Sequence, residues 1–140
     1  MPIHDHIAEL ADLDVTAKNV GFSEAQSINR TLLKKFFPNV KRATGDWVYN
    51  GYRWHAYSFK HEIAKTGDAA MENYRERHVM PFYAYFEFDD VLLDCLADQY
   101  PDIRTLDNDI YIFPHRVNWL FVTTHEASMG LGPYFALPSA

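Results

Sequence analysis

Apolar residues recur at helical spacing in residues 23–37, where the periodic pattern is clearest. Ser23 followed by Gln26 matches a capping box, and Pro38 would end the helix. One side of this helix would be buried, through Ile28, Leu32, Leu33 and Phe36.

Two further helices are predicted. One covers residues 68–78, with Asp68 as N-cap and a buried side formed by Ala70, Met71 and Tyr74. The other covers residues 89–99, because Asp89 or Asp90 would cap it and apolar residues follow.

Alternation of side chains predicts strands later in the chain. Residues 81–88 alternate cleanly, and residues 109–113 and 117–124 form two more apolar runs. In the last run Leu120 and Val122 would face away from Trp119 and Phe121. A strand that is apolar on both faces lies inside a sheet covered by helices. We therefore expect Trp119 to be nearly inaccessible to solvent.

Asn50-Gly51 predicts a hairpin over residues 46–59, since a type I′ turn needs positive φ at both central residues. Helices and strands follow without a regular βαβ order, which indicates an α+β fold. We expect a single domain over residues 1–140, with a mostly antiparallel or mixed sheet of about five strands and about three helices. Residues 1–14 would be a short helix or a loosely attached arm.

Composition indicates a folded protein with a large core. Of the chain, 48% is hydrophobic and 16% aromatic, which disfavours disorder. No apolar run is long enough for a membrane helix, and the first residues lack the pattern of a secretory signal. The single cysteine, Cys95, excludes an internal disulfide and fits a reducing compartment. We therefore expect a cytoplasmic protein that has no membrane partner.

The net charge of −6 is concentrated in one segment. Residues 87–109 hold one arginine, Arg104, and the acidic residues Glu87, Asp89, Asp90, Asp94, Asp98, Asp102, Asp107 and Asp109. Nucleic-acid binding is disfavoured, because phosphate contact needs a basic face. The basic residues Lys34, Lys35, Lys41 and Arg42 gather where helix ends would attract cations.

On the predicted third helix, Asp90, Asp94 and Asp98 would share one face. This acidic face is either a solvated surface or a docking site for a basic protein partner. Cys95 would lie on the apolar side of the same helix, where a thiol is inert.

His125 and Glu126 are the candidate catalytic residues. They follow the most buried strand, a position where loops often carry active groups. Either residue would act as general acid or base, beside a pocket lined by Trp54, His55 and Tyr134. The structural alternative is a capping box formed by Thr123 and Glu126, with Gly130 ending the turn.

Other chemistry is disfavoured by missing residues. His61-Glu62 begins a helical zinc motif, but position 65 is lysine; His4 and His6 lack further ligands. There is no Gly-x-Ser-x-Gly elbow and no phosphate-binding glycine loop. We therefore expect no metal and no cofactor.

From about Trp47 onward the sequence resembles a bacterial family catalogued as domain-of-unknown-function family 4275. Its middle part resembles Trp54-His55 with Ser58-Phe59 and the run Gly67-Asp68-Ala69-Ala70. Its C-terminal part resembles Asp109, Tyr111, Trp119, Thr124, His125, Glu126 and the run Gly132-Pro133-Tyr134-Phe135. The resemblance implies a small bacterial protein and assigns no activity.

Two functions remain from the sequence. The first is a non-catalytic binding or regulatory protein, similar in kind to enzyme inhibitors or immunity proteins, and it relies on the acidic face. The second is a small hydrolase that uses His125 and Glu126. Convergence of the candidate pocket residues would favour the enzyme, and their dispersal would favour the binding protein. The sequence does not fix the oligomeric state.

Overall fold

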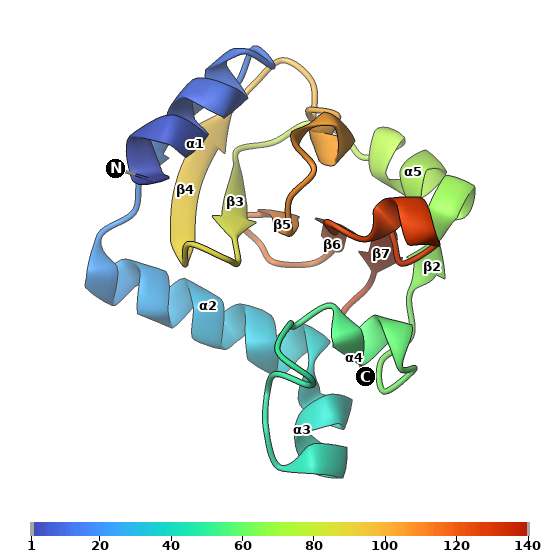
Figure 1. Ribbon diagram of the computed structural model, residues 1–140. Helices are drawn as coiled ribbons and strands as arrows, with labels where there is room; N and C mark the ends of the chain where they lie inside the picture. The colour runs from blue at the N-terminus through green and yellow to red at the C-terminus, as the bar shows by residue number, and fades with distance from the viewer. Residues whose placement is uncertain (1, 140) are drawn as a thin grey trace.

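The computed structural model describes residues 2–139, and its strands form one antiparallel sheet (Figure 1). The strand order is β1-β4-β3-β5-β6-β7-β2. The strands are β1 (Thr16–Asn19), β2 (Lys65–Thr66), β3 (Phe82–Phe86), β4 (Val91–Leu96), β5 (Ile110–Pro114), β6 (Leu120–Thr123) and β7 (Tyr134–Ala136).

Helices cover both faces of the sheet. They are α1 (Pro2–Ala11), α2 (Phe22–Phe36), α3 (Pro38–Thr44), α4 (His55–Ser58) and α5 (Gly67–Arg75), with the 3₁₀ turns η1 (Ile103–Leu106) and η2 (Ala127–Met129). The α+β class is confirmed, with more strands and helices than expected. Within residues 2–139 no helix has the length and apolarity needed to cross a bilayer.

Each strand side chain joins the core on its own face of the sheet. Along β3, Phe82 and Phe86 pack toward α1 and α5, while Tyr83 and Tyr85 pack toward α2 and α4. The same alternation holds in β6, which lies between β5 and β7. Its predicted interior position is confirmed, and Trp119, directly before it, is only 6% exposed.

The predicted helix over residues 89–99 is wrong. Residues 91–96 form β4, which pairs with β1 on one side and β3 on the other. Asp90 does not cap a helix, because it has a φ of 54° in the turn that joins β3 to β4. Aspartate suits such left-handed turn positions as well as helix N-caps. The segment forms a strand rather than a helix because, in the sheet, both of its faces and both of its edges are covered by other parts of the chain.

Losing this helix also removes the predicted acidic face. Asp90 lies in the turn and accepts a hydrogen bond from the hydroxyl of Tyr85. Asp94 lies within β4 and contacts His115, and Asp98 is exposed after the strand. Cys95 is buried as expected, but it is buried in a sheet, and burial raises the pKa of its thiol to about 12.

The predicted hairpin over residues 46–59 forms only at its tip. Asn50 and Gly51 have the positive φ values of the expected turn, and Tyr49 pairs with Tyr52. Beyond this pair the chain turns into α4. The predicted strands do not form, because Arg53 and Trp54 instead donate hydrogen bonds to the carboxylates of Glu87 and Asp109.

Three other predicted helices are present. Of the two alternatives for the N-terminal segment, the short helix is the one observed: residues 2–11 form α1, whose Leu10 is fully buried against the sheet, and Met1 lies outside the described residues. The helix over residues 23–37 is confirmed as α2, but Gly21 is its N-cap and Ser23 forms no capping bond. The helix over residues 68–78 is confirmed as α5, again without a capping bond from Asp68.

Candidate active site

Four of the five predicted site residues come together at one end of the sheet. Trp54 and His55 approach from the start of α4, while His125 and Glu126 follow β6. The rings of Trp54 and His125 are 6.1 Å apart, and those of Trp54 and His55 are 4.1 Å apart. Tyr134 does not join them, because it packs in the core against Tyr57.

Asp109 lies at the centre of this group. The residue is 3% exposed and directly precedes β5. Its Oδ1 accepts hydrogen bonds from the indole Nε1 of Trp54, at 2.9 Å, and from the backbone N–H of His125, at 3.1 Å. The Nδ1 atom of His125 lies 2.9 Å from both carboxylate oxygens. A buried carboxylate is stable only with such donors around it.

The carboxylate of Asp109 fixes how His125 presents its ring. A carboxylate accepts hydrogen bonds, so Nδ1 carries the proton and the neutral ring keeps a free electron pair on Nε2. The side chain of His125 is 39% exposed, and its Nε2 lies 4.0 Å from Oε1 of Glu126. This is the arrangement of a general base that is held by a buried acid and is open to solvent.

A second imidazole and two aromatic rings border His125. The Nδ1 atom of His55 lies 2.9 Å from the hydroxyl oxygen of Ser58. Burial lowers the pKa of His55, although the charges of Glu126 and Asp109 act in the opposite direction. His55 is therefore mainly neutral at neutral pH. The ring of Tyr52 packs 5.2 Å from that of His125.

The loop that carries Glu126 is held by Thr124, a role that was not predicted from the sequence. The Thr124 hydroxyl donates to the Leu131 carbonyl oxygen and accepts the backbone N–H of Glu126. Thr123 instead contacts the Asn108 carbonyl oxygen, so the predicted capping box is wrong. Gly130 does end the turn in a left-handed conformation, as expected. Glu126 thus keeps a side chain that is not used in capping.

A second carboxylate, Glu87, holds the backbone that leads into Trp54. Its Oε1 accepts the hydroxyl of Tyr111, and its Oε2 accepts the backbone N–H of Arg53 at 2.8 Å. Burial raises the pKa of Glu87, and the hydroxyl of Tyr111 partly offsets that rise. These bonds fix residues 53–54 and so place the indole of Trp54 over Asp109. Neither carboxylate could be assigned this role from the sequence, where both lie in the acidic segment of residues 87–109.

Within residues 2–139, no three or more His, Cys, Asp or Glu side chains are arranged to hold an ion. Glu62, half of the incomplete zinc motif, instead accepts the backbone N–H groups of Asn39 and Val40 at the start of α3.

Comparison with known proteins gives a family and no activity. Searches of curated proteins and of solved structures gave no match. The family described as domain of unknown function (DUF4275) matches residues 40–135, a range that contains Trp54, Asp109, His125 and Glu126. The match covers more than half of the chain and confirms the resemblance seen in the sequence. The chain belongs to the DUF4275 family.

Proposed function

We propose that the protein is a small hydrolase in which His125 is the general base and buried Asp109 orients it. The observation that carries this proposal is the contact between Nδ1 of His125 and the Asp109 carboxylate, at 2.9 Å. Asp109 is almost fully buried, whereas His125 is partly open to solvent. A packing role alone does not require a partly exposed imidazole whose Nδ1 is held by a buried carboxylate.

The proposed reaction is the hydrolysis of a small ester by an activated water. Nε2 of His125 takes a proton as the water oxygen attacks the acyl or phosphoryl centre. The Asp109 carboxylate and the nearby Glu126 stabilise the resulting imidazolium. The imidazolium then returns the proton to the leaving oxygen as the ester bond breaks. Tyr52, which is only partly buried and packs beside His125, provides an aromatic surface for the substrate, and the fully buried Trp54 lies behind it.

Over residues 2–139, the structure lacks the acidic helix face on which the inhibitor-like function was based. That function relied on three aspartates on one face of a helix, and these residues now lie in a turn, a strand and a loop. A basic partner protein remains a proposal without a defined docking surface. The converging residues around Asp109 therefore support the enzyme better.

The test compares two histidines that each contact an aspartate. His115 is 41% exposed and lies 2.8 Å from Asp94, which is itself partly exposed. Purified protein is assayed with p-nitrophenyl acetate, p-nitrophenyl butyrate and bis-p-nitrophenyl phosphate. His125→Gln should lower kcat/KM by about 10²–10⁴-fold, the usual contribution of a positioned base. His115→Gln should leave kcat/KM unchanged.

Two outcomes contradict the proposal. One is a parent protein that hydrolyses none of the three esters above the rate in buffer. The other is an activity that survives His125→Gln as well as it survives His115→Gln. Melting temperatures of both variants must stay near that of the parent, so that a lost activity reports chemistry rather than unfolding.

A further inference from the structure

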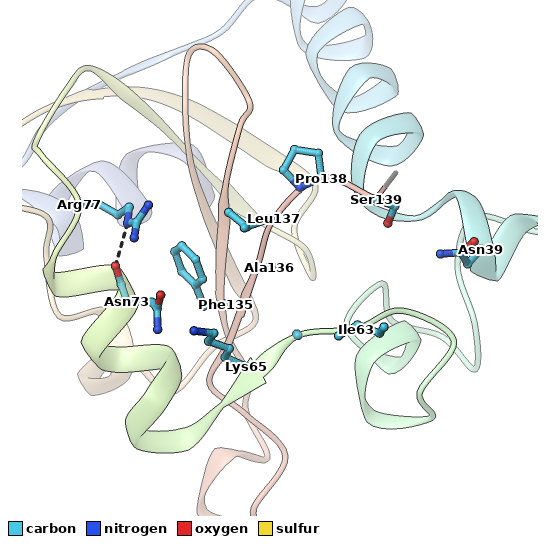
Figure 2. A pocket seen from close by; sticks show the side chains of 11 residues that line it. Asn39, Ile63, Lys65, Asn73, Arg77, Phe135, Ala136, Leu137, Pro138 and Ser139 are labelled. Carbon is cyan, nitrogen blue, oxygen red and sulfur yellow. Dashed lines mark hydrogen bonds between the residues drawn. The ribbon is translucent and has the colours of Figure 1, made fainter.

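A separate hollow of about 570 Å³ lies between α5, β2 and the segment that follows β7 (Figure 2). Ligand pockets commonly measure about 300–1,000 Å³. Neither His125 nor any residue around Asp109 lines it. A ligand in this hollow would therefore not touch the residues of the proposed hydrolysis.

The walls of this hollow are largely apolar. Phe135 and Ala136 form its floor from β7, and Leu137 and Ile63 stand at its rim. Leu137 is 62% exposed and Ile63 is 93% exposed. Large apolar side chains gathered at the mouth of a cavity mark a binding surface.

The charged residues of the hollow are both cations. Lys65 and Arg77 line it, and no carboxylate does, although the whole chain has a net charge of −6. Both cations flank Phe135: Lys65 is its partner in the pairing of β2 with β7, and the Arg77 guanidinium lies 5.2 Å from its ring. Positive charge and apolar surface therefore meet at one point.

The guanidinium of Arg77 is held in place, and its terminal N–H groups remain available to a ligand. Its Nε donates to the carbonyl oxygen of Asn73, at 3.0 Å, and its guanidinium stacks near the Phe135 ring. Within residues 2–139, its two terminal nitrogens have no hydrogen-bond acceptor. A guanidinium oriented in this way suits a carboxylate, which it can bind through two parallel hydrogen bonds.

We propose that this hollow binds a small amphipathic carboxylate. The carboxylate contacts Arg77 and Lys65, and the apolar chain extends from there toward the exposed side chains of Leu137 and Ile63. An extended peptide fits less well. The free edge offered by β2 is two residues long and passes directly into α5, so it cannot pair with a strand.

The proposal is tested by titrating the ¹⁵N-labelled full chain with octanoate and, separately, with octanol. Octanoate should shift the amide signals of residues 63–65, 73–77 and 135–137 in a saturable way. Octanol has the same chain without the charge, so it should bind at least about tenfold more weakly. Equal binding of the two compounds, or octanoate shifts that lie elsewhere, would overturn the proposal.

Two variants and one control locate the carboxylate. Arg77→Gln should weaken octanoate binding by about tenfold or more, whereas Arg75→Gln, the same change at an exposed position outside the hollow, should not. Ile63→Glu should also weaken binding, through repulsion at a side chain too exposed to affect folding. Octanoate affinity that is the same for Arg77→Gln and Arg75→Gln would overturn the proposal.

Discussion

The role of single residues at this site depends on partners far away in the sequence. Asp109 receives hydrogen bonds from Trp54 and His125, which are 55 and 16 positions distant. The sequence therefore indicated a role for His125 and Glu126, which stand beside a recognisable strand, whereas Asp109 was named only as part of the family resemblance, without a role. Glu62 shows the same effect, since it holds the start of α3 from 22 positions away. No local pattern encodes either contact.

His55 gives a prediction at the residue scale, through the pH dependence of stability. Burial lowers the pKa of this imidazole below its ordinary value of 6.5. Below about pH 6.5 the unfolded chain therefore binds more protons than the folded one, and acidification favours unfolding. The free energy of unfolding should rise with pH up to about 6.5 and then lose this dependence. His55→Gln should flatten that slope in urea titrations, and an unchanged slope would show that another group causes it.

At the scale of elements, the type of an element could be predicted from the sequence where one hydrophobic periodicity dominates. It could not be predicted where the same residues fit both a helix and a strand. The segments corresponding to α2, α5, β3, β5 and β6 were all predicted with the correct type. In the segment that forms β4, Asp89-Asp90 suits a helix cap and a turn equally well, and apolar residues surround Asp94 in a pattern compatible with either element. Pairing with β1 and β3 decides the outcome, and such pairing cannot be read from the segment itself.

The attachment of α1 gives a prediction at the element scale. The ring of His6 is buried on Phe86, with Nδ1 2.7 Å from Glu9 and Nε2 2.6 Å from Asp89. His6→Ala should destabilise the docked helix by about 1–3 kcal/mol, the typical cost of losing charge-assisted hydrogen bonds. Amide hydrogen exchange of residues 2–11 should therefore speed up.

The exposed His4, two positions before His6, provides the control for this experiment. His4→Ala should leave the exchange rates of α1 as they are in the parent protein. Equal protection of α1 in both variants would mean that Leu10 and its apolar neighbours alone hold the helix on the sheet.

At the scale of the molecule, the sheet determines where every site lies. Side chains of β6 alternate between the two cores, so one strand supports α4 on one face and α5 on the other. The candidate active site follows the end of β6, and the hollow beside Phe135 lies against α5. The sequence predicted the α+β class and this interior strand. It could not predict that β1 and the short β2 extend the sheet, because their exposed residues lack an apolar pattern.

Trp119 tests this arrangement of the whole molecule. It is 6% exposed and contacts Tyr74 of α5, Tyr100 and Phe135 of β7, so it joins three parts of the chain. Trp119→Ala should lower the free energy of unfolding by about 3–5 kcal/mol, and the melting temperature by about 10 °C or more. The half-buried Trp47 is the control, and Trp47→Ala should cost much less. If Trp119→Ala melts within a few degrees of the parent, Trp119 does not hold α5 and β7 together.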